Sequence, residues 1–388
     1  MRDFNTLKSI VANIATEIAA ANAEDVDKNA RFPTESINAL KSQKILSTGV
    51  PAELGGDELD IEQQGQLCKI LARKCSSSAM VLGMHFIKVS SIVHFRHQDP
   101  FFENYLKQLH QEQRLVGSVT SEEGIGGNLR NSIAAVKNDI DRFTLEKHSS
   151  CLSYGAYADD LLITCRRADD SAASDQVLLL GTKDDLELTQ NGVWDSMGMR
   201  GTCSPPFIVK VNAMKCQIFN SSFAEIAART MVPDTHIIWA HIWLGIATEA
   251  AHRARSLIQM KARKTPDSLP AGASELAELE IRLDRFRDTV RSVTSSFLDA
   301  HKADDAELLS SIPFSLKING LKLNASQLVA EICTRAMAIC GFPGYLNNTP
   351  YSISRLLRDS LSAAPMIGNG RIIETNATHL MAYKGEGI

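Results

Sequence analysis

Leu161-Leu162-Ile163-Thr164 and Val177-Leu178-Leu179-Leu180 are short apolar runs bounded by turn residues, in the middle of a 388-residue chain. Similar runs occupy residues 133–136 and 207–211. Runs of this length, rich in branched apolar side chains and separated by turn residues, are typical of β-strands. The segment from about residue 115 to 220 is therefore predicted to be rich in strands.

Helical patterns lie on both sides of this strand-rich segment. Upstream, Leu7, Ile10, Ile14 and Ile18 recur at helical spacing. Downstream, helical periodicity extends over residues 222–263, 274–302 and 315–340. We therefore predict an α+β protein with an N-terminal helical domain (1–113), a middle β domain (114–221) and a C-terminal helical domain (222–388).

Composition excludes several classes of partner. The net charge is −4 and the Lys and Arg residues are scattered, which argues against a nucleic-acid or anionic-membrane partner. The longest apolar runs are far shorter than the ~20 residues of a membrane span, and the N-terminal residues lack the apolar core of a signal peptide.

The eight cysteines form no Cys-x-x-Cys pair, as expected for reduced thiols in a cytoplasmic protein. His94 and His97 form only a lone pair, so no metal site is expected.

The segment that begins Arg358-Asp359 and continues Ser360-Leu-Ser-Ala-Ala-Pro-Met-Ile367-Gly-Asn-Gly-Arg371 carries the first resemblance. It resembles the acyl-CoA dehydrogenase segment in which an Arg-Asp pair precedes a loop ending Glu-Gly-Thr. In that family the Glu removes the α-proton of an acyl thioester while FAD takes the β-hydride. Counting without a gap places Ile367 at the Glu position. Ile has no titratable group and cannot act as a general base.

The resemblance implies a middle β-barrel or β-sandwich, a C-terminal four-helix bundle and a flavin loop at 118–128. The sequence Ser118-Val-Thr120-Ser121-Glu-Glu-Gly-Ile-Gly126-Gly127-Asn resembles the family's Thr-Glu-Pro-Gly-Ala-Gly-Ser-Asp segment. By that resemblance Thr120, Ser121, Gly126 and Gly127 would bind FAD. Hydroxyl and backbone N–H donors suit the flavin edge that becomes negative on reduction. A plain β-turn is the alternative.

A second flavin element is expected at the end of the strand around residues 143–155. This stretch resembles a family strand ending Lys-x-Trp-Ile-Thr-Asn-Gly, in which the Trp packs on the flavin ring. Cys151 stands at the Trp position and Ser153 keeps the hydroxyl. A buried structural thiol is the alternative for Cys151. The stretch Trp194-Asp-Ser-Met-Gly-Met-Arg200-Gly-Thr202 resembles a further family turn that builds the β domain, with Thr202 as a weaker site candidate.

Three further cofactor contacts are implied by resemblance. Arg263-Lys264-Thr265-Pro266-Asp267 resembles the Arg-x-Thr-Phe-Gly element with which a neighbouring subunit meets the flavin pyrophosphate, so a homo-oligomer (dimer or tetramer) is expected. Gly341-Phe-Pro-Gly344 resembles a Gly-rich turn near the same dinucleotide, although a turn that ends a helix explains it equally well. Asn369, beside the Ile367 position, is a further cofactor candidate.

Some family members carry the base on the helix after the β domain, as a Glu-Arg pair ten residues before a Leu-Gly step. Leu244-Gly245 sets this register, and the pair here reads Thr235-His236. His236 could move a proton, since an imidazole titrates near pH ~6.5; a buried histidine at a helix start is the alternative. His85 lies on the helix that walls the family's substrate pocket, which gives it a candidate substrate-facing role.

The resemblance covers nearly the whole chain and implies a FAD-dependent oxidoreductase. With both base positions empty and the flavin wall changed, the main expectation is oxidation of an acyl-CoA or carrier-bound thioester in specialised metabolism, with O2 as acceptor. One alternative is a dehydrogenase with a relocated base that passes electrons to an electron-transfer flavoprotein. Another is a non-catalytic member that holds no flavin.

Overall fold

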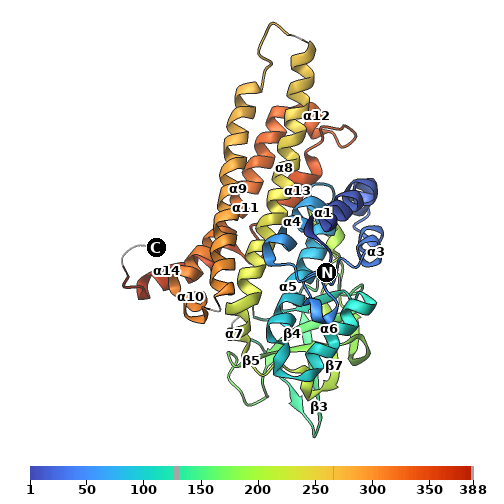
Figure 1. Cartoon of the computed structure of the whole chain (residues 1–388), viewed down its shortest axis with the longest axis vertical. Helices are drawn as coiled ribbons and strands as arrows, with labels where there is room; N and C mark the ends of the chain where they lie inside the picture. The colour runs from blue at the N-terminus through green and yellow to red at the C-terminus, as the bar shows by residue number, and fades with distance from the viewer. Residues whose placement is uncertain (126–130, 265, 304, 386–388) are drawn as a thin grey trace.

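Two small β-sheets lie at one end of the molecule, and long helices extend from them to the other end (Figure 1). The computed structural model describes residues 1–388 except 126–130, 265, 304 and 386–388. Helices precede and follow the strands, which confirms the predicted order along the chain. The domain boundaries at 113 and 221 stay predictions.

The helix α5 is buried along almost its whole length, mainly between α4 and α8. By length and composition the segment Ser76–Gln98 could cross a membrane, but 78% of its most apolar window is buried inside the protein. It therefore serves here as the core helix of this region. The helices of this part are α1 (Phe4–Asn13), α2 (Ala20–Lys28), α3 (Thr34–Ser42), α4 (Ile61–Ala72), α5 (Ser76–Phe95) and α6 (Pro100–Glu112).

The strands form one sheet in the order β1-β4-β5 and another in the order β2-β3-β7-β6. In β3 and β7 buried and exposed residues alternate, whereas β4 and β5 are buried almost throughout. The inward residues of both sheets share one apolar cluster, as in a sandwich. The strands are β1 (Val116–Val119), β2 (Lys137–Asn138), β3 (Arg142–Ser149), β4 (Asp160–Arg166), β5 (Gln176–Gly181), β6 (Leu186–Gln190) and β7 (Phe207–Met214).

The predicted strand at 133–136 is wrong, since β2 begins at Lys137 and only Ala135 forms an isolated bridge. The backbone N–H groups of Ile133 and Ala134 donate instead to the buried carboxylate of Glu122. The carboxylate of Glu122 thus binds the first two donors of this segment, and only the backbone of Arg166, at the end of β4, pairs with Ala134 and Val136.

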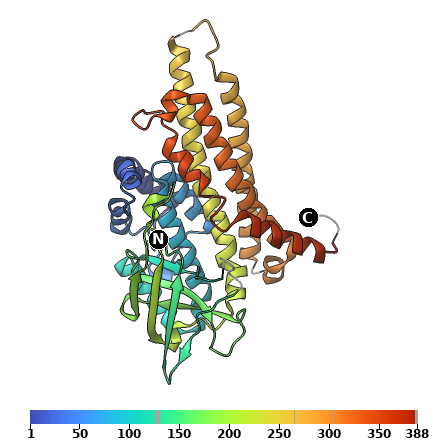
Figure 2. The same ribbon diagram turned by 180° about the vertical axis from the view of Figure 1, so that it is seen from behind.

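The C-terminal part consists of three long helices and several short ones, and the predicted helical segments 222–263, 274–302 and 315–340 are confirmed. The long helices α8, α9 and α11 pack on one another, and the short α13 packs on α8 and α11. The last helix, α14, projects sideways from the body (Figure 2). The helices are α7 (Phe223–Ile226), α8 (Val232–Lys264), α9 (Ala273–Lys302), α10 (Ala306–Ser310), α11 (Ile312–Cys340), α12 (Phe342–Tyr345), α13 (Ser354–Leu361) and α14 (Asn369–Ala382).

Arg358 and Asp359, on α13, join the C-terminal helices to the turn that follows the β6 strand. The buried carboxylate of Asp359 accepts the backbone N–H of Met199 at 2.7 Å. Arg358 donates to the carbonyl of Met197 at 2.9 Å and forms an ion pair with Asp27 on α2. Three parts of the chain are thus connected by two adjacent side chains.

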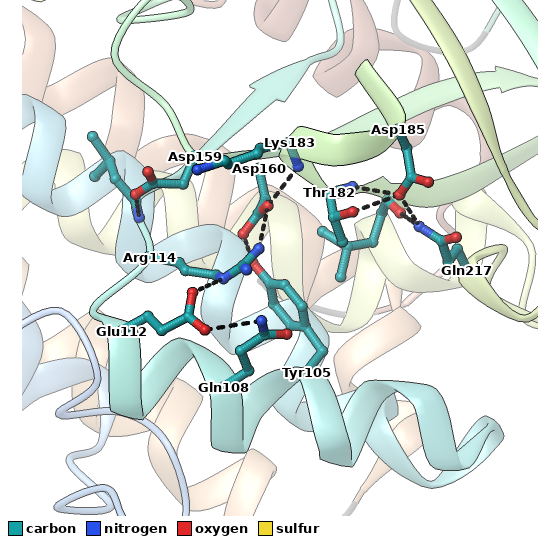
Figure 3. Close-up of polar contacts among 12 residues, drawn as sticks. Tyr105, Gln108, Glu112, Arg114, Asp159, Asp160, Thr182, Lys183, Asp185 and Gln217 are labelled. Carbon is teal, nitrogen blue, oxygen red and sulfur yellow. Dashed lines mark hydrogen bonds and ion pairs between the residues drawn. The ribbon is translucent and has the colours of Figure 1, made fainter.

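Asp160 anchors α6 to the first sheet in a second network (Figure 3). Its fully buried carboxylate accepts hydrogen bonds from the hydroxyl of Tyr105 at 2.8 Å and from the guanidinium of Arg114 at 3.0 Å. The backbone N–H of Lys183 donates to it at 2.9 Å. Burial raises the pKa of Asp160 despite these partners. Because the carboxylate is enclosed and satisfied, the network serves the fold rather than a reaction.

His85 connects α5 to β1, so the expected substrate-facing role of His85 is wrong. Its Nε2 donates to the carbonyl of Leu46 at 2.8 Å, and its Nδ1 accepts the backbone N–H of Val116 at 3.0 Å. The side chain is fully buried, and burial lowers its pKa to about 4. Both ring nitrogens are used within the protein, and none is left for a ligand.

As the pH drops from about 6.5 towards 4, His85 takes up a proton in the unfolded chain but stays neutral in the folded protein. The free energy of unfolding should therefore fall over this pH range. The contribution of this one residue is up to roughly 3 kcal/mol. His236 and His241 act in the same direction. In His85→Gln the amide can keep both hydrogen bonds without titrating, so its unfolding free energy, measured in urea at pH 7.5 and 5, should fall by less. An equal fall in both proteins would contradict this account.

Replacing Gly198 by Ala should destabilise the junction, because the added Cβ would lie 2.2 Å from the carbonyl oxygen of Arg358. We expect a loss of about 2 kcal/mol in unfolding free energy, as for other overpacked sites. The control is Gly320→Ala in α11, where no atom lies within 4 Å of the added Cβ. That change should be neutral or stabilise by up to about 1 kcal/mol. Equal urea midpoints for the two variants would refute the close contact.

Candidate functional site

Thr120 and Ser121 follow β1, and Ser121 lies beside the residues at and after the end of β3. The hydroxyl of Ser121 donates to the carbonyl of Cys151 at 2.7 Å and accepts its backbone N–H at 3.2 Å. The hydroxyl of Ser149 lies 2.9 Å from that of Ser121. The structure therefore brings together two of the predicted cofactor elements. Gly126 and Gly127 lie outside the described residues.

A second set of hydroxyls lies next to these. Ser204 donates to Ser153 at 2.9 Å, and its hydroxyl is also 2.9 Å from that of Thr202. Thr202 is buried, Ser153 is partly exposed and Cys151 is exposed. The alternative of a buried strand thiol is therefore wrong for Cys151. These neighbouring hydroxyl groups are here named the hydroxyl rim; they belong to Ser121, Ser149, Ser153, Thr202 and Ser204. The exposed thiol of Cys151 lies beside them, where the resemblance places an aromatic wall.

Glu122, next to this rim, is turned into the protein. Its carboxylate accepts from the hydroxyl of Ser132 at 2.7 Å and from the backbone N–H of Ala134 at 2.6 Å, and it lies 3.5 Å from the ammonium of Lys147. Although burial opposes ionisation, these partners together hold the pKa of Glu122 below its usual value. Glu122 stabilises the loop and offers no free base.

The rim fits a flavin ring in its chemistry. The partly exposed hydroxyls of Thr120 and Ser153 are uncharged and can donate to the ring oxygens and nitrogens. The neighbouring carboxylate of Glu122 is withdrawn, whereas that of Glu123 is exposed. Thr120, Ser121 and Ser153 are the residues that would hold the ring. Cys151 is exposed and is a smaller side chain than the Trp that the resemblance places there.

The other predicted cofactor residues lie away from this rim. Arg263 is exposed in the last turn of α8, a helix of 33 residues, or about 50 Å, that starts next to the sheets. Gly341 ends α11 with φ 60°, and a Cβ on Gly344 would lie 2.4 Å from the Cβ of Cys340. These two glycines fit a turn that closes a helix. A single chain does not bring Arg263 to the hydroxyl rim.

Ile367, at the position of the absent Glu, adopts an unusual backbone conformation. Its φ is 48°, a left-handed value that is rare for a β-branched residue. The ammonium of Lys322 donates to the Ile367 carbonyl at 2.7 Å and to Oδ1 of Asn369 at 2.6 Å. Ser326 accepts from the Asn369 amide at 3.1 Å. The side chain of Asn369 is thus used to hold the loop, and a cation rather than a carboxylate lies beneath the base position.

The second base position is likewise without a carboxylate. Thr235 donates to the carbonyl of Met231 at 2.5 Å. His236 is buried, its Nδ1 donates to the carbonyl of Ile318 at 3.2 Å, and burial lowers its pKa to about 4. His236 is therefore neutral near pH 7, in agreement with a buried histidine at a helix start. Neither its position nor its pKa favours a proton shuttle at neutral pH.

Several buried charged residues were missed by sequence reasoning, among them Lys88 on α5, Asp234 on α8 and Lys322 on α11. Burial lowers the pKa of Lys88 and of Lys322 to about 8 and raises that of Asp234 to about 7. One signal was available, since Lys88 is the only Lys, Arg, Asp or Glu in the apolar segment that forms α5. Within the described residues, no group of three or more His, Cys, Asp and Glu side chains is placed to hold a metal ion.

Comparisons with known proteins agree with this geometry. The family model for the N-terminal domain of acyl-CoA dehydrogenases matches residues 3–100, and that for the C-terminal domain matches residues 227–377. Cyclohex-1-ene-1-carbonyl-CoA dehydrogenase of Geobacter metallireducens is 22% identical over 94% of this chain and 93% of its own length.

Solved structures share the whole fold. Butyryl-CoA dehydrogenase from Megasphaera elsdenii superposes with a TM-score of 0.80 at 17% identity, covering 98% of this chain and 99% of its own. Dibenzothiophene monooxygenase from Paenibacillus sp. A11-2 gives 0.80 at 17% identity, covering 98% of both chains. Since the two family models together span more than half of the sequence, in the order of the helical regions described above, the chain belongs to the acyl-CoA dehydrogenase family.

Proposed function

We propose that this protein is a FAD-dependent oxidoreductase that acts on an acyl-CoA or carrier-bound thioester in specialised metabolism, with O2 as electron acceptor. One observation carries the proposal: Ile367 and Thr235 occupy both expected base positions, and neither can remove an α-proton. The oxidation of an acyl thioester by α-proton abstraction is therefore disfavoured, while a flavin reaction that does not begin with that step remains open to the site.

The open flavin wall supports O2 as acceptor. The exposed Cys151 is much smaller than a Trp and leaves space beside the ring position. Oxygen needs such access to a reduced ring. The likeness in fold to a monooxygenase agrees with this proposal, although it establishes only the fold.

Bound flavin would supply the redox centre, accepting electrons from the substrate and passing them on. The chain itself would contribute the hydroxyls of Thr120 and Ser153 as hydrogen-bond donors to the ring edge, while Ser121, which donates to the carbonyl of Cys151, would hold the two loops together. Lys322 would hold the loop at Ile367 in place through its two hydrogen bonds. Because Arg263 lies at the far end of α8, we propose a homo-oligomer, dimer or tetramer, in which this cation serves the pyrophosphate of another chain.

The exposed apolar side chains of α14 support an oligomer as well, since Ile373, Leu380 and Met381 are 53%, 45% and 85% exposed on a helix that projects from the body. We further propose a cytoplasmic location, in agreement with the cysteines, none of which is in a disulfide.

The second candidate is a dehydrogenase with a relocated base that passes electrons to an electron-transfer flavoprotein. The full-length similarity to an acyl-CoA dehydrogenase favours it. The enclosed His236, with its lowered pKa, does not supply the base that this candidate needs. A colourless purified protein would instead support the third candidate, a flavin-free member of the family.

The purified protein should be yellow, with the absorption bands of oxidised flavin, and should reoxidise rapidly in air after anaerobic reduction. Cys151→Trp should keep the flavin spectrum but slow reoxidation at least about tenfold, corresponding to ~1.4 kcal/mol in the barrier, by closing the space beside the ring. Cys151→Ala, which leaves that space open, is the control. Slow reoxidation of the parent protein, together with efficient electron transfer to an electron-transfer flavoprotein, would refute the oxygenase proposal.

Ile367→Glu should introduce α-proton exchange that the parent protein lacks, because it restores a carboxylate at the base position. Incorporation of deuterium from D2O into a bound saturated acyl-CoA, followed by mass spectrometry, measures this exchange. Ile367→Gln has the same shape without the base and should remain inactive. Exchange by the parent protein would show that another base is present and would favour the dehydrogenase candidate.

A further inference from the structure

The strand β6 forms an edge of its sheet at which a further strand can pair. The sheet order β2-β3-β7-β6 leaves two edges, and the strand at the other edge, β2, is exposed and only two residues long. So short an edge strand offers little backbone for another strand to pair with. By contrast, β6 is five residues long, contains no Pro and, within the described residues, pairs only with β7.

The edges of the other sheet are occupied by groups of the protein itself. On β1 the backbone N–H of Val116 donates to the ring of His85, and its carbonyl accepts the hydroxyl of Tyr154. On β5 the carbonyl of Leu178 accepts the backbone N–H of Phe219. Proteins cover, shorten or charge their sheet edges because an open edge is a template for another chain. Here β6 is the edge strand of five or more residues that lacks a covering segment within the described part of the chain.

The pairing with β7 fixes the direction in which each β6 residue points its backbone groups. The N–H of Asn191, directly after β6, donates to the carbonyl of Pro206, so these two residues are a hydrogen-bonded pair. Hydrogen-bonded and non-hydrogen-bonded pairs alternate along antiparallel strands. Glu187 and Thr189 therefore also direct their N–H and C=O groups to β7.

The remaining β6 residues, Leu186, Leu188 and Gln190, direct their backbone groups to the open edge. The N–H of Leu186 is bonded to the carbonyl of Lys183. The N–H and C=O groups of Leu188 and Gln190 have no partner strand among the described residues. A strand placed beside β6 would therefore find free donors and acceptors at the spacing of an antiparallel ladder.

A groove of about 480 Å³ lies along this same edge, here named the β6 groove. The side chains of Leu186, Leu188 and Phe207 supply its apolar lining, and the segment 155–159, which leads into β4, lines it as well. Leu186 and Leu188 pack on the apolar cluster that the two sheets share, yet both are only half-buried. The core of the sandwich is thus partly open to solvent beside the unpaired backbone of β6.

One end of the β6 groove carries an unmatched positive charge. Two charged residues line the groove, Asp159 and Lys183, and both lie next to Asp160 (Figure 3). The carboxylate of Asp159 forms an ion pair with Lys41 on α3 at 2.9 Å. Lys183 is exposed and forms no ion pair within 4.0 Å with a residue that the structure describes. Since Lys183 precedes β6 in the chain, this cation lies where β6 begins.

We propose that the β6 groove binds an extended peptide segment of another protein, which adds to the sheet as a fifth, antiparallel strand. Its backbone pairs with Leu188 and Gln190, and apolar side chains at every second position cover Leu186 and Leu188. Antiparallel pairing matches every other strand pair of this sheet and brings the C-terminal end of the peptide to Lys183. The partner is therefore a segment with alternating apolar residues and a carboxylate at its C-terminal end. This interaction is independent of the proposed flavin chemistry.

The probe is the synthetic peptide acetyl-Lys-Thr-Val-Thr-Val-Thr-Asp with a free C-terminal carboxylate, labelled with fluorescein on its Lys. Fluorescence anisotropy with the full-length chain should give saturable binding with a Kd on the order of 10–100 µM. A form that ends in Asn and a C-terminal amide should bind about threefold more weakly. Lys183→Met should abolish this difference, whereas the control Lys210→Met, an exposed lysine on the outer face of β7, should keep it. Absence of saturable probe binding would overturn the proposal.

Methylation of single peptide nitrogens tests the pairing itself. A residue opposite Leu188 shares its face of the sheet and directs its own N–H to β6, so the N–H groups of the probe valines bond to β6 and those of its threonines point to solvent. N-methylation of the second Val should weaken binding at least about tenfold. N-methylation of the middle Thr should change it by less than about twofold. Equal losses for the two peptides would contradict strand addition.

Gln190→Pro tests the same edge from the side of the protein. It removes an N–H that points to the groove, so it should weaken the probe at least about fivefold and leave the unfolding temperature and the flavin spectrum of the protein unchanged. Thr189→Pro is the matched change at an N–H that bonds to β7, and it should lower the unfolding temperature. Unchanged probe binding by Gln190→Pro would overturn the proposal. So would a smaller mass in sedimentation without a loss of probe binding, since a second copy of this chain would then be the partner of the edge.

Discussion

The hydrogen bond from the backbone of Met199 to the buried carboxylate of Asp359 is the contact on which the arrangement of the parts depends. It joins residues 160 positions apart, one in the connection between β6 and β7 and one on α13. Asp359 is buried, and burial raises its pKa, so its ionised form depends on the donors that surround it. The neighbouring Arg358 extends the same contact to Asp27 at the N-terminal end of the chain. If this junction moved, the sheets would lose their position relative to the helices that carry the site.

Two buried lysines lie on the helices that pack in the interior of the molecule. Lys322 lies beneath Ile367, and Lys88 faces α8 near Asp234. A buried lysine is costly unless it is satisfied. Lys322 is satisfied by a carbonyl and an amide oxygen of the loop, which explains how the left-handed Ile367 is held.

Much of the fold followed from local patterns. The strands β4, β5 and β7 and the three long helices were predictable because apolar residues repeat with the period of their secondary structure. The segment 133–136 has the same apolar character, but the prediction of a strand there was wrong. The carboxylate of Glu122 binds two of its backbone N–H groups and its pairing with β4 is limited to Arg166, and no pattern in those four residues reveals these partners. The predicted substrate-facing role of His85 was wrong for a similar reason. Its two hydrogen bonds reach Leu46 and Val116, and only folding brings these groups to the ring.

The candidate site, too, could be predicted only in part from the sequence. By itself, the sequence determined which residue types stand at the expected positions: no carboxylate at Ile367 or Thr235, a small thiol at Cys151 and hydroxyls at Thr120, Ser121 and Ser153. Only the tertiary structure decided which of these lie together and which charges are enclosed. Ser121 and Cys151 meet, whereas Arg263 lies a whole long helix away. The physical reason is that hydrogen-bond satisfaction and burial depend on groups distant in sequence, while residue type and periodicity are properties of the chain alone.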